Sequence, residues 1–272
     1  MSKKVLGVFV VVVILLVVVV ALAAMVGIAM WMSGPDVSQK TVLELNLEKG
    51  MIEWPPADPV GELFLRDTPK LIDVVEALDR AAEDERVVGV VARIGAAPIG
   101  LAQVQELRDA IERFRSRDKF AIAWAETFGE VGPGNSAYYL ATAFDEIYLV
   151  PSGDIGLTGL LYQSQFFEGL LDKVGAKARM DHRKEYKNAM NVYTEKSFTE
   201  AHEEAMRHLA ESHYGQIVRA IAESRGMYEN EVRKLIDRGP YLGEEAMEAG
   251  LVDGIAYRDQ VYDKLDEKAG ED

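Results

Sequence analysis

The stretch Val87-Val88-Gly89-Val90-Val91-Ala92-Arg93-Ile94 determines the fold expected for this chain. It is an apolar run of strand length, interrupted by a single arginine. A strand with one face in water alternates apolar and polar residues, whereas a parallel strand covered on both faces is apolar almost throughout. The run therefore predicts an α/β protein whose sheet lies between layers of helices.

Strands and helices alternate on both sides of this run, as a parallel sheet with helical crossovers requires. Further strands are predicted at residues 41–47, 120–124, 146–150, 176–180 and 251–255. Helices are predicted to start at Thr68 and at residues 101–117, 135–143, 166–174, 198–226, 228–238 and 243–249, with a last helix ending near Glu267. Met180 and Phe198 are predicted to be core residues. The order predicts one domain over residues 41–272, joined to the N-terminus by a polar linker at 33–40.

An uncharged apolar stretch of about 27 residues, from Val5 to Trp31, precedes the linker. It is long enough to cross a bilayer as one helix. Lys3 and Lys4 stand before it, so the positive-inside rule places the N-terminus in the cytoplasm. We therefore expect residues 1–32 to be a cytoplasmic tip and a single transmembrane anchor, with residues 5–31 in the lipid bilayer. The anchor would lie in the inner (cytoplasmic) membrane and hold the domain on its periplasmic, extracytoplasmic side.

A cleaved signal peptide is the alternative for this stretch, because Ala21-Leu22-Ala23 resembles a small-residue cleavage site. A signal peptide has an apolar core of roughly 7–15 residues. The stretch here is longer and continues past those alanines, which favours an uncleaved anchor.

Charge and residue composition exclude several classes of function. After residue 32 the chain carries 30 − 2 = 28 basic residues against 45 acidic ones, a net charge of −17. This argues against nucleic acid as a partner. The chain has no cysteine, so it forms no disulfide. Its four histidines are too scattered to suggest a metal site, and we expect no metal and no cofactor.

Four motifs, in this order, resemble one known family. They are Val90–Ile94 with the following helix at 102–111, Ala137–Ile147 with its Tyr138-Tyr139 pair, Tyr186-Lys187-Asn188-Ala189, and Ala246–Asp253. The chain resembles the signal peptide peptidase A family, which comprises membrane-anchored Ser/Lys proteases of peptidase family S49. The resemblance covers nearly all of the part beyond the linker, and it implies the ββα superhelix of the Clp protease/crotonase fold.

The resemblance implies a serine endopeptidase that degrades cleaved signal peptides and other apolar peptides with a Ser/Lys dyad. Lys187 matches the general-base lysine. The alternative for Lys187 is a surface lysine beside Lys184 and Glu185. The long form of the family has two tandem copies of the domain, of which the first carries the lysine and the second the serine. This chain resembles the first copy, so the serine would come from a second domain or chain, and the family's ring-like assemblies imply a homo-oligomer.

The chain departs from the family pattern at the nucleophile. Counting back from Tyr138-Tyr139 puts Asn135 at the nucleophile's position, followed by Ser136. Ser136 could be a relocated nucleophile, but a shift of one helical residue rotates the side chain by about 100°, so helix capping by Ser136 and Asn135 is favoured. Gly95 and Gly100 could donate backbone N–H groups to an oxyanion or could form a plain turn.

Two other functions remain open on these departures. The chain could be a catalytically inactive, membrane-tethered scaffold or regulatory homologue. It could also be a solitary protease that uses Ser136 as its nucleophile.

Overall fold

The computed structural model describes residues 16–22, 24–25, 37–54, 58–65, 68–95, 99–129 and 132–270. The chain divides into two units, Met1–Gln39 and Lys40–Asp272. In the first unit, residues 16–22 and 24–25 are helical and exposed. Most of the anchor predicted over 5–31 lies outside the described residues, and within the described part no helix is both long and apolar enough to cross a membrane.

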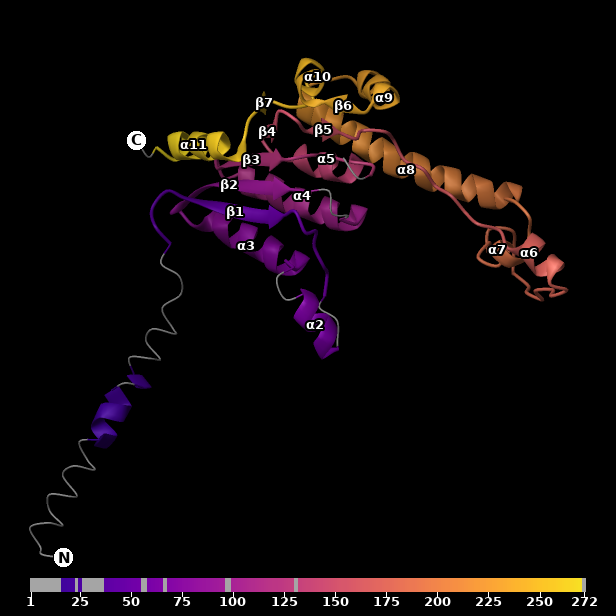
Figure 1. The fold of residues 1–272 in the computed structure, drawn as a ribbon, viewed down its shortest axis with the longest axis horizontal. Coiled ribbons are helices and arrows are strands. Elements are labelled where there is room, and N and C mark those ends of the chain that lie inside the picture. The colour runs from indigo at the N-terminus through magenta and orange to yellow at the C-terminus, as the bar shows by residue number, and fades with distance from the viewer. Residues whose placement is uncertain are drawn as a thin grey trace, which may run out of the picture. The chain divides into compact units, whose positions relative to one another are not determined.

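The second unit is built on a five-stranded parallel sheet (Figure 1). Its strand order is β1-β2-β3-β4-β7. The strands are β1 (Thr41–Leu47), β2 (Val87–Ile94), β3 (Phe120–Ala125), β4 (Glu146–Leu149) and β7 (Gly254–Ile255). β2 pairs with β1 and β3 along almost its whole length. The predicted parallel α/β class is confirmed, with the apolar run 87–94 as an internal strand between β1 and β3.

Helices cover both faces of the sheet. Helices α3 (Leu71–Glu83), α4 (Leu101–Arg115) and α5 (Asn135–Ala141) lie on one face (Figure 1). On the other face, α11 (Arg258–Ala269) buries Val261 and Leu265 against side chains of β2, β3 and β4. Both faces of β2 and β3 are therefore dry, which explains why these strands are apolar throughout.

An arm projects from this body (Figure 1). Its strut is the first half of α8 (Glu200–Arg225), whose second half is buried in the body from Gly215 to Ala222. Residues 160–199 run outward along the strut, form α6 (Glu168–Lys173) and α7 (Asn191–Thr194) at its far end, and return. We call residues 160–214 the arm. Helix α8 begins after Thr199, whose side chain caps it by accepting a hydrogen bond from the His202 N–H. It ends at Gly226, which has a left-handed conformation.

Two short strands and three further helices complete the second unit in the described residues. A short antiparallel pair joins β5 (Asp154–Ile155) to β6 (Tyr241–Leu242). The other helices are α2 (Pro59–Leu65), α9 (Glu229–Arg238) and α10 (Gly243–Glu248).

Three predictions about local structure are wrong. Residues 176–180 form no strand, since they lie exposed on the arm, where no neighbouring strand pairs with them. Met180 is 51% exposed and Phe198 36% exposed, so neither is a core residue. Helix α3 begins at Leu71 rather than at Thr68, because the N–H groups of Ile52 and Leu71 bond across a bridge to Pro69 and Ile52.

Arg108 joins α4 to α5, and its replacement tests that contact. Arg108 is 7% exposed, donates to the Tyr139 carbonyl and to Thr142 Oγ1, and stacks 4.3 Å from the centre of the Tyr139 ring. We expect Arg108→Ala to lower the free energy of unfolding by about 2 kcal/mol, because it removes two buried hydrogen bonds and the stacking on the Tyr139 ring. Denaturant unfolding followed by tryptophan fluorescence measures the change.

Arg113 of the same helix supplies the matched control. It pairs with Asp79 at the surface, where both side chains are about half exposed. Arg113→Ala should change the stability by less than about 0.5 kcal/mol. Equal losses in the two variants would contradict a special role for Arg108.

Candidate functional site

Lys187 lies at the far end of the arm, on the loop between α6 and α7, and its side chain is exposed. A turn forms the loop here: the Lys187 N–H donates to the Lys184 carbonyl at 3.2 Å, and Lys184 has a left-handed φ of 71°. The Tyr186 hydroxyl donates to Glu204 Oε2 at 2.5 Å, which fastens the loop to the first turns of α8. This hydrogen bond to a carboxylate raises the pKa of Tyr186.

The start of α5 holds Asn135 and Ser136, but neither caps the helix. The N-cap residue is Gly134, and no side chain caps this end. The predicted capping role is therefore wrong. The reason is steric: a Cβ at position 134 would lie 1.3 Å from the Phe128 carbonyl oxygen, so only glycine fits where a capping side chain would stand. Ser136 is half-buried in the first turn.

Backbone hydrogen bonds join the glycine-rich loop before α5 to the segment around β5. The Phe128 N–H donates to the Asp154 carbonyl at 2.8 Å, and the Gly156 N–H donates back to the Phe128 carbonyl at 2.8 Å. The Gly134 N–H donates to the Gly156 carbonyl at 2.9 Å. The loop at the carboxyl end of β3 is therefore held on its partner segment by its own backbone groups.

Asn135 extends this connection with its side chain. It is 3% exposed, its Nδ2 donates to the Gly159 carbonyl at 2.8 Å, and the Gly159 N–H donates to its Oδ1 at 3.1 Å. This contact has no signal in the sequence, because the two residues are 24 positions apart and no local pattern links them.

The two predicted oxyanion glycines are engaged in local structure. A Cβ at Gly95 would lie 2.6 Å from the Glu48 Cα, so glycine permits a close approach of two backbones after β2. Gly100 precedes α4, and its N–H donates to Gln103 Oε1 at 3.0 Å. As folded here, the Gly100 N–H already has an acceptor, and an oxyanion role for either glycine stays a prediction.

The structure does not bring Lys187 and Ser136 together. Tyr186, next to Lys187, is bonded to Glu204, whereas the buried part of α8 begins at Gly215. Those eleven residues of helix span roughly 16 Å at about 1.5 Å per residue. A base must approach a serine hydroxyl to roughly 3 Å. Within one chain, the lysine and the serine therefore cannot form a dyad in this conformation.

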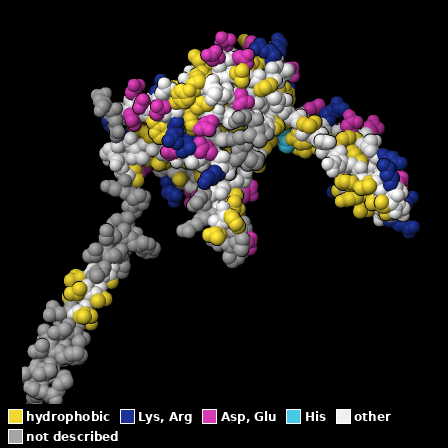
Figure 2. All heavy atoms as spheres, viewed as in Figure 1, with side chains coloured by type: hydrophobic (Ala, Val, Ile, Leu, Met, Phe, Trp, Pro, Cys, Tyr) yellow, Lys and Arg dark blue, Asp and Glu magenta, His cyan; other side chains and the backbone are white. Residues whose placement is uncertain are grey.

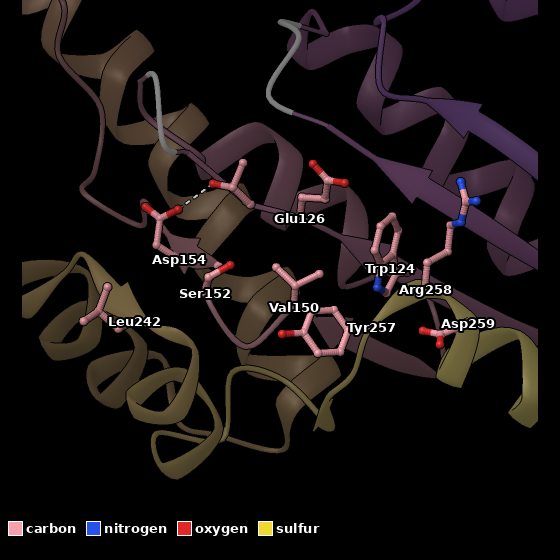
Figure 3. Close-up of a pocket in the computed structure, with 11 residues that line it drawn as sticks. Trp124, Glu126, Val150, Ser152, Asp154, Leu242, Tyr257, Arg258 and Asp259 are labelled. Carbon is pink, nitrogen blue, oxygen red and sulfur yellow. Dashed lines mark hydrogen bonds between the residues drawn. The ribbon is translucent and has the colours of Figure 1, made fainter.

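A pocket of about 1030 Å³ opens at the carboxyl ends of β3, β4 and β7, on the face that α11 covers only in part (Figure 3). Trp124, Val150 and Tyr257 form its apolar wall, and it also contains the charged residues Glu126, Asp154, Arg258 and Asp259. The carboxyl ends of parallel strands are a common place for ligands. Lys187, Ser136, Gly95 and Gly100 are not among the described residues that line it.

Ser152 also lines this pocket, but it has none of the bases that a Ser/Lys or Ser/His pair would need there. The described lining residues include neither a lysine nor a histidine. Asp154 accepts a hydrogen bond from Thr127 Oγ1 at 2.5 Å and thereby holds the pocket wall (Figure 3). The pocket is thus a concave polar and aromatic surface, separate from the predicted catalytic residues.

Tyr138 fixes the other side of α5. It is fully buried, and its hydroxyl donates to the Leu251 carbonyl at 2.6 Å. Burial raises the pKa of Tyr138, so the phenol stays protonated and serves as a structural donor. The Tyr138-Tyr139 pair therefore belongs to the framework of α5, with Tyr139 under Arg108.

Comparisons with known proteins agree on one family. The model of "Peptidase family S49" matches residues 113–271, which is more than half of the chain. Serine protease SPPA, chloroplastic, of Arabidopsis thaliana is 30% identical over 191 residues, covering 70% of this chain and 28% of that protein. Protease 4 of Haemophilus influenzae is 27% identical over 226 residues, covering 76% of this chain and 35% of that protein.

A third relative, from Enterococcus faecium, is provisionally named signal peptide peptidase SppA. It is 26% identical over 231 residues, covering 84% of this chain and 63% of that protein. The chain thus spans less than two thirds of the length of each of these three relatives. By the match over residues 113–271 and these similarities, the chain belongs to peptidase family S49 and is similar to the SppA and Protease 4 proteins.

Proposed function

We propose that this chain is the lysine-bearing part of a membrane-anchored Ser/Lys peptidase that degrades apolar peptides such as cleaved signal peptides. The observation that carries the proposal is the position of Lys187, exposed at the end of an arm and remote from Ser136. Such a lysine can reach a serine outside its own body. The family membership and the names of the relatives support a peptidase.

In the proposed reaction, Lys187 acts as general base. Its neutral amine takes the proton of a serine hydroxyl while the serine oxygen attacks the peptide carbonyl. The lysine then returns the proton to the leaving amine, and water hydrolyses the acyl-enzyme by the same exchange. In the proposed assembly, the partner that brings the serine also covers Lys187 and removes it from water. The chemistry uses no metal and no cofactor.

The surface of the arm has the character of an interaction surface, which supports the proposal of a partner there. Large apolar side chains stand exposed there, among them Leu161 at 87%, Leu170 at 59% and Val174 at 69% (Figure 2). Exposed apolar groups that gather on one projecting element are typical of an interaction surface. We propose that a serine-bearing second domain or chain docks on this surface, within a homo-oligomer of Clp protease/crotonase-like ββα domains.

Residues 5–31 are proposed to anchor the chain in the inner membrane, with the N-terminus cytoplasmic and the domain at 41–272 extracytoplasmic. The apolar length and the two preceding lysines support this topology. The anchor would keep the active site close to the bilayer, where released signal peptides reside.

The second candidate is a catalytically inactive, membrane-tethered scaffold. Two observations favour it: the nucleophile position holds a buried asparagine bonded to Gly159, and the Gly100 N–H is occupied by Gln103. In a scaffold, Lys187 would be a solvated surface residue without a catalytic part.

Replacing Lys187 tests the proposed base. We expect Lys187→Met to lower kcat/KM by about 100-fold or more, which is the contribution of a positioned general base. The measurement is hydrolysis of a fluorogenic apolar peptide by full-length protein purified from membranes, including any second chain that copurifies. Lys177→Met is the matched control, because Lys177 is an exposed lysine of the same loop, and its activity should stay within about twofold. Equal activity of the two variants would rule out Lys187 as the base.

Labelling with a fluorophosphonate separates the three candidate functions. We expect the probe to leave Ser136 unmodified, because no base approaches its hydroxyl, and to modify a serine outside this chain. Intact-mass analysis of every chain in the preparation measures the adducts. An adduct at Ser136 that disappears in Lys187→Met would establish a solitary protease. A folded preparation with no adduct and no peptidase activity would support the scaffold.

The anchor is tested by fractionation of cells that express the full chain. We expect the protein to remain in the membrane pellet after an alkaline carbonate wash and to retain Met1–Trp31 by intact mass. A variant lacking residues 5–31 should move to the soluble fraction. A mature chain that begins just after Ala23 would instead identify a cleaved signal peptide.

A further inference from the structure

The side chain of Asn135 acts as a clamp on one backbone position. Its carboxamide donates to the Gly159 carbonyl at 2.8 Å and accepts from the Gly159 N–H at 3.1 Å. It thus satisfies both polar groups of a single residue, as a facing residue does in an antiparallel ladder. A carboxylate of similar size only accepts, and a hydroxyl donates and accepts through a single atom, whereas a carboxamide offers a separate donor and a separate acceptor.

Gly159 is the point at which the chain leaves the body for the arm. Leu157, two residues earlier, is fully buried, whereas Leu161, two residues later, is 87% exposed. Gly159 itself has a left-handed φ of 80°, which turns the chain outward. On the body side, the bond from the Gly134 N–H to the Gly156 carbonyl holds the same segment. The Asn135 clamp is therefore the last fixed point before residues 160–166, which we call the outgoing segment of the arm.

Beyond the clamp, the outgoing segment is held by side-chain contacts with α8 and with the residues just before it. The Tyr162 hydroxyl and His213 Nδ1 share a hydrogen bond, and the Phe166 ring lies edge-on to the Phe198 ring at 5.2 Å. In the described residues 160–166, no backbone hydrogen bond fixes the position of the outgoing segment along α8. Its position along α8 therefore rests on these side-chain contacts and on where the segment starts, which is Gly159.

We propose that Asn135 is a positioning residue. It sets the position of the outgoing segment along α8 and thereby the place at which the arm presents Lys187. The clamp has a second consequence, since both backbone groups of Gly159 are occupied. As the chain is folded here, an extended peptide cannot pair with the backbone of Gly159. The catalytic consequence rests on the proposed function of Lys187, whereas the clamp itself does not.

The absence of native cysteine allows a direct test of the arm's position. Cysteines are introduced at two exposed positions, Lys177→Cys on the arm and Glu106→Cys on α4 of the body. Both carry nitroxide labels, and the labelled full-length chain is diluted with unlabelled chain so that only distances within one molecule contribute. Pulsed electron–electron double resonance measures the distribution of distances between the two labels. We expect one narrow distribution with Asn135 and a shifted or clearly broadened one in Asn135→Ala.

Thr142→Val is the matched control for a lost buried hydrogen bond. Thr142 and Asn135 are each 3% exposed, and Thr142 lies just past the opposite end of α5, away from Gly159. This variant should keep the narrow distribution. Hydrogen exchange of the Gly159 amide should accelerate by about tenfold or more in Asn135→Ala and stay unchanged in Thr142→Val. Asn135→Asp, which keeps the acceptor and loses the donor, should behave like Asn135→Ala in the distance measurement.

The outcomes separate this inference from the proposed function. An unchanged distance distribution together with unchanged Gly159 exchange in folded Asn135→Ala would overturn the clamp. If the clamp holds and Lys187→Met leaves the peptidase activity intact, the function proposed for Lys187 fails alone. If both hold, Asn135→Ala should lower kcat by roughly 10- to 100-fold through a misplaced base, while Thr142→Val stays within about twofold.

Discussion

The ion pair between Arg225 and Asp253 fixes the direction of α8, and the arm depends on that direction. Arg225 donates to both carboxylate oxygens of Asp253, at 2.8 and 2.9 Å, and to the Gly250 carbonyl at 2.8 Å. Asp253 also accepts from the Ile147 N–H of β4. Burial lowers the pKa of Arg225, but the hydrogen bonds to Asp253 outweigh it and leave the pKa raised. The last turn of α8 is thereby fastened to the central sheet.

A helix held at one end and continuous over 26 residues works as a stiff strut. The second half of α8 packs against the body, whereas the first half carries polar residues and the outgoing segment that runs along it. The body and the arm consequently differ in what they can contribute to chemistry. The body offers loops at the carboxyl ends of parallel strands, and the arm offers Lys187 at a distance from all of them. Any reaction that uses both kinds of group needs a second surface opposite the arm.

The sequence predicts the sheet and the helices well because burial leaves a local signature. The run 87–94 is apolar on both faces, and α8 was expected within two residues of its observed ends. The alternation at 176–180 has the same period as a strand, but a strand also needs a partner, which periodicity does not reveal. The helix start at Asn135 is confirmed, but the predicted capping role of Asn135 and Ser136 is wrong, because the close approach of Gly134 to Phe128 excludes a capping side chain. Lys187 was found only through a motif, since an exposed lysine has no pattern of its own.

The contact between Asn135 and Gly159 connects the start of α5 with the root of the arm. One position at the start of a helix can hold a hydroxyl that attacks a carbonyl or a carboxamide that binds a backbone, but not both. Under the proposed function, an asparagine there leaves this body without the nucleophile and, by the same two hydrogen bonds, fixes the root of the arm. The missing hydroxyl and the placement of Lys187 would then be two results of one side chain. A lysine presented in this way would act only in the proposed assembly, because the helix start of its own body is occupied by the residue that holds the arm in place.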